Sequence, residues 1–288
     1  MKVAVFGATG TIGTALLPVL ARSHDVVALS RRERKGAGMN WLRADAGDAE
    51  SVRRALEGVD VAYYLVPSLG THDFEERDLA AARIVAAEAG RAGLSQLIYL
   101  GGLGDDSPEL STHLRSRLET EKALASGPVP LTTLRAAIVI GRGSAGFETI
   151  VALVDRLPAM VCPRWVGVRT QPIAIVDVVE YLAGVCGLPQ AIGASFDIGG
   201  PDVMTYREMI ERVGAERGKR PLIVEVPVLT PRLSSYWLHL VTPVKASVAR
   251  PLIEGLRNET VAKDERIREL LPRELTPFDV AARAALDD

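Results

Sequence analysis

The sequence has few of the residues that cross-link a chain or bind metals. Of its 288 residues only two are cysteines, Cys162 and Cys186, and four are histidines. Two cysteines build neither a disulfide framework nor a cysteine-rich metal cluster. We expect both to be small buried residues and no metal to be bound, and a reducing cytoplasm is the simplest setting for such a chain.

Strong net charge and long apolar runs are also lacking. The formal net charge is −2, so no global field draws the protein to nucleic acid or to an anionic membrane. No apolar run approaches the roughly 20 residues that span a bilayer. An apolar strand is expected from residue 2 onward, so we expect no signal peptide. What is present, 48% hydrophobic residues in a chain of this length, suffices for a large core.

A glycine-rich stretch organises the chain: Gly7-Ala8-Thr9-Gly10-Thr11-Ile12-Gly13. It follows the apolar run 2–6, which predicts a strand, and precedes the periodic segment 14–20, which predicts a helix. The first glycine allows a tight turn, the second lets backbone approach a pyrophosphate, and the third lets the helix lie close to the sheet. The spacing is one residue wider between the first two glycines than the usual Rossmann form. The alternative is a glycine-rich turn without ligand. We predict a dinucleotide site with these contacts: Gly7, Thr9, Gly10, Thr11, Ile12 and Gly13.

The residues after the second predicted strand, 25–29, indicate which dinucleotide is preferred. A carboxylate at this point accepts from the ribose 2′-hydroxyl of NAD, whereas arginine accommodates the 2′-phosphate of NADP. Here the sequence is Ser30-Arg31-Arg32, followed by Arg34 and Lys35. The alternative is a solvated basic loop. We predict that Arg31 and Arg32 favour NADP(H) over NAD(H).

Strands and helices continue to alternate along the chain. Strands are expected at 41–44, 59–66 and 96–100 and helices at 49–57 and 73–92, which predicts an α/β fold with a doubly wound parallel sheet. Ligands collect at the carboxyl ends of such strands. Asp45 therefore either accepts from the adenine amino group or makes an Asx turn. The other predicted cofactor contacts at strand ends are Val66, Pro67, Ser68, Gly101 and Gly102.

Several segments together resemble the atypical or extended short-chain dehydrogenase/reductase superfamily, in its NmrA-like branch of bacterial NAD(P)-binding proteins. Besides the glycine stretch they are 65–68, the fifth strand with its helix, 134–141, 172–179 and 196–201. The resemblance implies a Rossmann core over 1–143, rejoined by about 172–200. It also implies a smaller, mostly helical substrate lobe formed by 144–171 and 201–288.

The sequence departs from the resemblance at the residues that carry chemistry. Active members place Ser at the end of the fifth strand and Tyr-x-x-x-Lys on the next helix. Gly101 and Gly102 occupy the serine region here, and His113 and Arg117 stand at the tyrosine and lysine positions. The resemblance implies that His113 donates a proton and that Arg117, a fixed cation, holds the nicotinamide ribose. The alternative is a polar helix face on which Arg117 neutralises Glu121.

The remainder of the chain offers weaker signals. We expect a helix over 144–157 and an irregular or strand-like segment over 160–170. Four residues of these segments are candidates either for substrate contacts or for packing: Phe147, Arg164, Trp165 and Arg169. Thr205 and Glu208 predict a capping box, and Asp48 is expected to cap the helix 49–57. The tail 230–288 is expected to be mostly helical. Its apolar stripe packs in the core, or forms a lid, a dimer surface or a membrane-surface helix: Leu233, Tyr236, Trp237, Leu240 and Val241.

Two functions fit these observations. The first is an NADPH-dependent reductase of a small apolar acceptor such as a quinone or conjugated ketone, which needs less acid assistance than a simple carbonyl. The second is a non-catalytic NADP-binding redox sensor that reports to a protein partner. The expected partners are a small-molecule substrate and either a second copy of the chain or another protein.

Overall fold

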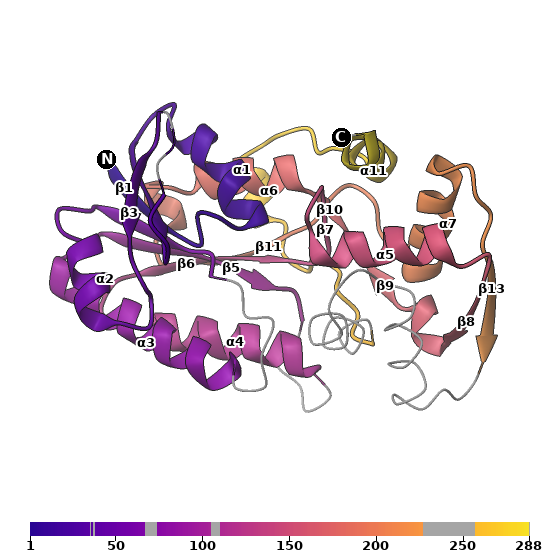
Figure 1. Cartoon of the computed structure of the whole chain (residues 1–288), viewed down its shortest axis with the longest axis horizontal. Helices are drawn as coiled ribbons and strands as arrows, with labels where there is room; N and C mark the ends of the chain where they lie inside the picture. Colours follow the sequence, from indigo (N-terminus) through magenta and orange to yellow (C-terminus); the bar gives the residue numbers. More distant parts are fainter. Residues whose placement is uncertain (35, 37, 67–73, 105–109, 227–256, 288) are drawn as a thin grey trace.

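Seven parallel strands form the central sheet, in the spatial order β11-β6-β5-β4-β1-β2-β3 (Figure 1). The computed structural model describes residues 1–34, 36, 38–66, 74–104, 110–226 and 257–287. Except at the edge strand β3, the strands are mostly buried, as expected for a sheet covered on both faces. Their bounds are β1 Lys2–Phe6, β2 Asp25–Ser30, β3 Asn40–Arg43, β4 Val61–Tyr64, β5 Gln96–Gly102, β6 Leu131–Ala136 and β11 Ser195–Ile198.

The winding of the sheet reverses at β1, which pairs with β2 on one side and β4 on the other. Open α/β sheets bind ligands outside the carboxyl ends of the strands at such a point. Phe6 is in register with Tyr64, so the loop that starts at Gly7 and the exit of β4 leave the sheet side by side. The predicted doubly wound α/β fold is therefore confirmed.

Helices cover both faces of the sheet. Val3 and Val5 join the apolar cluster beneath α1 and α6, whereas Ala4 and Phe6 join the cluster beneath α2, α3 and α4. This alternation follows from the two-residue period of a strand. The bounds are α1 Thr11–Leu20, α2 Ala49–Ala55, α3 Phe74–Ala92, α4 Thr112–Ala125 and α6 Ile175–Gly184.

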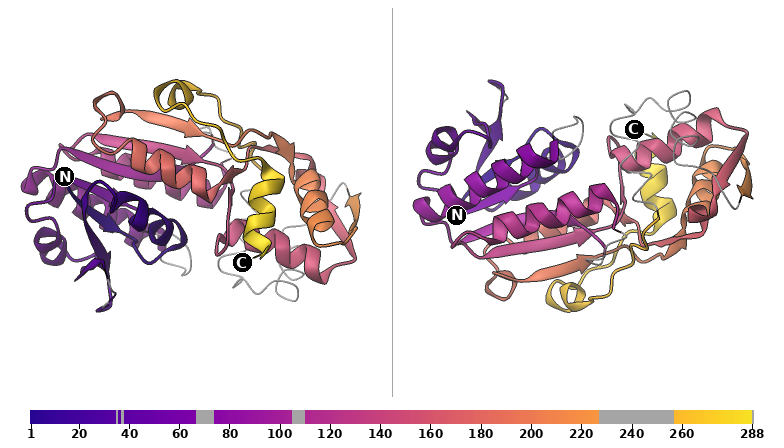
Figure 2. Two further views of the ribbon diagram at one scale, coloured as in Figure 1. Left: turned by 90° about the horizontal axis from the view of Figure 1, so that it is seen from above. Right: turned by 90° about the horizontal axis from the view of Figure 1, so that it is seen from below.

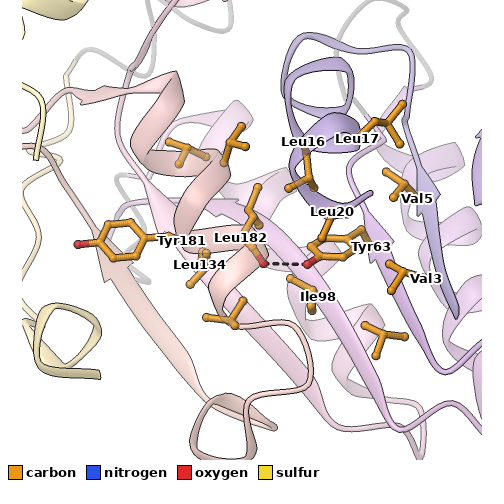
Figure 3. Close-up of a cluster of buried hydrophobic side chains, with 14 of the residues drawn as sticks. Val3, Val5, Leu16, Leu17, Leu20, Tyr63, Ile98, Leu134, Tyr181 and Leu182 are labelled. Atoms are coloured by element: carbon orange, nitrogen blue, oxygen red, sulfur yellow. Dashed lines mark hydrogen bonds between the residues drawn. The ribbon is translucent and has the colours of Figure 1, made fainter. Parts of the chain in front are cut away.

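The cluster beneath α1 and α6 contains a buried tyrosine (Figure 3). Tyr63 of β4 packs among apolar side chains such as Leu20 and Ile98 and is fully buried. Its hydroxyl donates to the carbonyl oxygen of Leu182 at 2.8 Å. A buried hydroxyl without a partner is costly, so this bond fixes α6 against the sheet.

A third apolar cluster lies beyond the sheet, where α5, α7 and α11 pack together (Figure 1). Three two-stranded pairs accompany these helices: β7 with β10, β9 with β12 and β8 with β13. Thr205 caps α7, and the capping box with Glu208 is confirmed. The bounds are β7 Val139–Ile140, α5 Ala145–Arg156, β8 Ala159–Pro163, η1 Arg164–Gly167, β9 Arg169–Thr170, β10 Ile173–Ala174, η2 Pro189–Ala191, β12 Met204–Thr205, α7 Tyr206–Glu216, β13 Leu222–Val226 and α11 Phe278–Asp287.

The C-terminal segment 257–287 crosses from this third cluster to the sheet and back (Figure 2). Thr260 donates to Thr170 at 2.8 Å between the hydroxyl oxygens, and Arg266 donates to the carbonyl oxygen of Ser195 at 2.7 Å. The segment therefore joins the two parts of the molecule through hydrogen bonds. Its helices are α10, Arg266–Leu270, and α11.

Three elements differ from the sequence expectations. The first helix begins at Thr11 rather than at residue 14, because Gly10 already acts as its N-cap. The fourth strand, Val61–Tyr64, is shorter than 59–66, although the N–H groups of Asp60 and Leu65 still donate to carbonyl oxygens of Lys2 and Phe6 beside its two ends. In the described part of the tail only α10 and α11 are helical, because Pro272 and Pro277 interrupt the chain between them. The predicted stripe 233–241 lies outside the described residues.

Three further expectations concern membrane crossing, the two cysteines and metal binding. No described helix combines the length and apolar character that crossing a bilayer requires. Cys162 is buried and Cys186 is half-buried, and neither forms a disulfide. No cluster of potential metal ligands occurs among the described residues.

Candidate cofactor and catalytic site

Two of the three loop glycines are fixed by the protein's own backbone. Gly7 has φ +80°, and a Cβ placed on it would lie 2.2 Å from the carbonyl oxygen of Leu65. A Cβ on Gly13 would lie 2.3 Å from the carbonyl oxygen of Gly7. No side chain fits at such distances, so both positions require glycine whether or not a ligand binds.

Gly10 is different, because the chain around it leaves room. Its backbone is extended, and a Cβ would meet only the carbonyl oxygen of Gly7, at 3.3 Å. It is the N-cap of α1, yet no side chain caps this helix and no acidic residue lies in its first turn. The helix thus offers its first N–H groups and its positive dipole end at the open side of Gly10. This arrangement fits a pyrophosphate held by the backbone.

The other loop residues have distinct surroundings. Thr9 is exposed at the turn, and Ile12 packs partly against the cluster beneath α1 and α6. Thr11 donates from its hydroxyl to the carbonyl oxygen of Gly143 at 2.7 Å. Gly143 in turn donates from its N–H to Glu148 of α5 at 3.0 Å. The loop is therefore tied to the start of α5, a link that sequence reasoning missed because 132 positions separate the two residues.

The basic segment lies at the carboxyl end of β2, next to the glycine loop. Arg31 and Arg32 are exposed, and neither makes an ion pair within the described ranges. Arg34 lies over the ring of Trp41, 5.7 Å from its centroid. Lys35 lies outside the described residues. Two unpaired guanidinium groups thus stand where a ribose 2′-phosphate is expected.

Asp45 makes the Asx turn that was the structural alternative. Its Oδ1 accepts from the N–H of Gly47 at 3.0 Å, and its own N–H donates to Ser51. Asp48 accepts from the N–H of Glu50 and so caps α2 as expected. Because Asp45 is also exposed, the adenine contact stays a prediction.

The residues at the carboxyl ends of β4 and β5 form the rest of the candidate site at this edge of the sheet. Val66 is half-buried, and its N–H lies 3.0 Å from the position of a Cβ on Gly7. Pro67 and Ser68 lie outside the described residues. A Cβ on Gly102 would lie 3.8 Å from Cγ of Arg117, so the end of β5 faces α4. Gly101 lies beside Tyr99 instead, with 3.3 Å between its Cβ position and the ring.

The structure brings the two predicted catalytic residues together on α4, one turn apart. The hydroxyl of Ser111 caps this helix by accepting from the N–H of Leu114. His113 is partly exposed, but its Nδ1 is buried with no hydrogen-bond partner in the described chain. Burial and the adjacent Arg117 cation lower the pKa of His113 to about 3. The imidazole is therefore neutral near pH 7, which removes the imidazolium that the sequence had suggested as proton donor.

Arg117 does not neutralise Glu121, the pairing offered by the alternative interpretation. Glu121 instead accepts two hydrogen bonds from Arg135 of β6, at 3.1 and 2.7 Å. This pairing raises the pKa of the Arg135 guanidinium. Glu121 faces the sheet, whereas Arg117 lies over the end of β5. The ion pair thus fixes α4 to the sheet and leaves Arg117 without an ion pair to any carboxylate among the described residues.

Two tyrosines that sequence reasoning did not select lie beneath this turn of α4. Tyr99 donates from its hydroxyl to the carbonyl oxygen of Arg117 at 3.2 Å. The ring of Tyr64 packs against it with 6.3 Å between centroids. Burial raises the pKa of both hydroxyls, while the charge of Arg117 opposes the rise. Their places in apolar strands hid them, since only the packing of α4 brings them beside Arg117.

The lobe residues weighed as substrate contacts have mixed positions. Phe147 is buried in the third cluster and therefore serves packing. Arg169 is exposed on β9. The side chains of Arg164 and Trp165 lie outside the described part of the structure.

Comparisons with known proteins agree with this site. Residues 7–137 match the family model described as NAD(P)H-binding. A relative from Streptomyces griseus, (4-alkanoyl-5-oxo-2,5-dihydrofuran-3-yl)methyl phosphate reductase, is 28% identical over 292 residues, which cover 95% of this chain and 94% of the relative.

Solved structures share the fold over nearly the whole chain. A Citrobacter sp. triphenylmethane reductase complexed with NADP(H) has a TM-score of 0.77 at 19% identity, covering 99% of this chain and 100% of that one. A nucleoside-diphosphate-sugar epimerase from Staphylococcus aureus has a TM-score of 0.78 at 15% identity, with 98% and 100% covered. The chain thus carries an NAD(P)-binding Rossmann-like domain, and these structural neighbours are named as an epimerase and a reductase.

Proposed function

We propose that this protein is an NADPH-dependent reductase that transfers hydride to a small conjugated acceptor, such as a quinone or conjugated ketone. The observation that carries the proposal is the neutral His113 beside Arg117 at the positions where tyrosine and lysine are expected. A site whose histidine is uncharged suits an acceptor whose conjugated system spreads the incoming charge, because such an acceptor takes its proton from water.

The chain's own residues divide the remaining work. The loop Gly7–Gly13 holds the pyrophosphate on backbone N–H groups, and Asp45, Val66, Pro67 and Ser68 line the adenosine and ribose. Arg31 and Arg32 bind the 2′-phosphate and favour NADP(H) over NAD(H). The bound nicotinamide supplies the hydride. Gly101 and Gly102 end β5 beside α4, and the substrate lobe is the third cluster around α5, α7 and α11, whereas α10 packs against the sheet.

The relatives support a reductase with a conjugated substrate. The name of the Streptomyces griseus relative describes a ring double bond with two carbonyl groups on one of its carbons, together with a phosphate. The Citrobacter sp. neighbour is named as a triphenylmethane reductase. Both names denote reductases, which supports reduction as the reaction for this chain.

The test is NADPH oxidation, followed by its absorbance, against a panel of quinones, enones and simple ketones. We expect turnover with the conjugated acceptors and at least about tenfold lower kcat/KM with simple ketones, which need an acid. Gly10→Val serves as the control that should remove activity with every acceptor. Turnover confined to simple ketones would contradict the proposal.

Tight NADPH binding without turnover of any acceptor would favour the second function, a non-catalytic redox sensor. The same neutral His113 motivates that alternative, because it removes the usual proton donor from the site. The sensor predicts that NADPH and NADP⁺ differ in their effect on binding of a protein partner.

A further inference from the structure

The guanidinium of Arg117 is a partly buried cation without a compensating anion. The carboxylate of Glu121, one helical turn away, accepts two hydrogen bonds from Arg135 instead. Arg117 itself makes no ion pair with any residue that the structure describes. Removing a charge from water without pairing it is unfavourable, so a ligand that brings negative charge to this point binds with an advantage.

The histidine and tyrosine groups around Arg117 are neutral, although the carboxylate of Asp78 also acts on Tyr64 and that of Glu121 on Tyr99. His113 carries no charge near pH 7, and burial keeps the hydroxyls of Tyr64 and Tyr99 protonated. The positive charge of Arg117 reaches all three, because it lowers the pKa of each. The side chain starts beside Gly102, at the carboxyl edge of the sheet where the reaction is proposed. Arg117 is therefore the source of positive potential in this part of the described site.

Arginine at this position has a different chemistry from lysine. Lysine presents a compact ammonium that suits ribose hydroxyls, whereas the planar guanidinium presents five donors in a fork that matches delocalised oxyanions. We propose that Arg117 is a catalytic residue that binds the carbonyl oxygen of the conjugated acceptor and stabilises the oxyanion formed there. This role replaces the ribose contact implied by the family resemblance, and it rests on the reductase function proposed above.

The step balances without a protein acid. A hydride adds with its electron pair to the β-carbon of the acceptor, the π bond shifts to the α-carbon and carbonyl carbon, and the carbonyl π pair moves onto oxygen. The resulting enolate carries its negative charge beside the guanidinium; for a quinone, a proton shift from the ring carbon to oxygen then gives the hydroquinone. Water then delivers a proton to the enolate and the cofactor leaves oxidised. Donors aimed at an oxygen where charge develops typically contribute on the order of a hundredfold to a thousandfold in kcat.

The first experiment compares Arg117→Gln, Arg117→Lys and wild type. Arg54→Gln, on the exposed surface of α2, is the control that removes the same charge. We expect Arg117→Gln to lower kcat by about a hundredfold or more and Arg117→Lys by about tenfold. The Kd for NADPH, measured by fluorescence, should change less than about threefold, because the oxyanion forms on the acceptor. A kcat within threefold of wild type, or a loss explained wholly by weaker NADPH binding, would overturn the proposal.

The second experiment needs no turnover. 4-Nitrophenol is titrated into the NADP⁺-bound protein, and its ionisation is followed by the absorbance of the phenolate. We expect the pKa of the bound phenol to fall by about one unit, which is a tenfold preference for the anion, and Arg117→Gln to abolish the shift. An equal pKa in wild type and Arg117→Gln would overturn the anion site. A preserved shift in a protein that reduces no acceptor would instead overturn the reductase function and leave the anion site standing.

Discussion

The glycine loop and the first turns of α4 border the same carboxyl edge of the sheet, yet different physics determines them. In the loop, backbone atoms of neighbouring residues fix the residue types, as at Gly7 and Gly13. On α4, burial and a neighbouring charge decide what the side chains do, as at His113. The glycine pattern of the cofactor half is therefore visible in the local sequence, even though Leu65 helps to fix Gly7, whereas the chemistry of the other half depends on side-chain packing between distant segments.

The largest effect is expected in the glycine loop, from adding one methyl group to a glycine. We expect Gly7→Ala and Gly13→Ala each to lower the free energy of unfolding by at least about 4 kcal/mol, because each Cβ would overlap a backbone oxygen. Gly10→Ala is the matched control and should cost less than about 1 kcal/mol. Chemical denaturation measures all three. Near-equal stabilities of the three variants would show that the loop glycines are not constrained by the fold.

The α4 half depends on the ion pair between Glu121 and Arg135. We expect Glu121→Gln to lower the free energy of unfolding by about 2–3 kcal/mol, because it leaves a largely buried cation with a weaker partner. This estimate is below that for a fully buried pair, since a third of the Arg135 side chain is exposed. Urea denaturation of this variant beside Glu119→Gln, an exposed neighbour on α4, tests it. Equal losses would mean that the pair does not hold the helix.

His113 makes the stability of the protein depend on pH. Its pKa is about 3 in the folded protein and about 6.5 when unfolded, so the unfolded chain binds the extra proton as pH falls through this window. Stability contributed by the neutral ring is present above about pH 6.5 and is lost towards pH 3. Between pH 7 and pH 4 we expect the free energy of unfolding of His113→Phe to fall by about 2 kcal/mol less than that of wild type. This value is reduced from the full linkage effect because His113 is partly exposed. Parallel pH profiles of the two proteins would contradict the depressed pKa.

The loop could be predicted from the sequence because its three glycines lie within seven consecutive residues, although the contact of Gly7 with Leu65 could not. Sequence reasoning found Thr205 and Asp48 as caps for the same reason, since the hydrogen bonds are local. It placed His113 and Arg117 on one helix face, but it gave His113 the wrong charge state for a proton donor near pH 7. It also did not find Tyr64 and Tyr99. Both errors have the same cause, the packing of α4 against the sheet, which no local sequence pattern reports.

The smallest expected effect concerns cofactor choice. We expect wild type to bind NADPH at least about tenfold more tightly than NADH, because an arginine–phosphate contact contributes about 1.4 kcal/mol or more. Arg31→Ala combined with Arg32→Ala should remove the preference without changing NADH affinity. Calorimetric titration with both cofactors measures it. A preference that persists in the double variant would remove these residues from the phosphate site.

The most direct test of the dinucleotide site is the affinity of Gly10→Val for NADPH. The backbone at Gly10 is extended, and a Cβ there meets only one atom of the protein, so the variant should fold. Its side chain would fill the space where the pyrophosphate approaches the backbone. We predict a thermal midpoint close to that of wild type together with at least about a hundredfold weaker NADPH binding, or about 2.7 kcal/mol. A folded Gly10→Val with unchanged NADPH affinity would contradict the site on which the account rests.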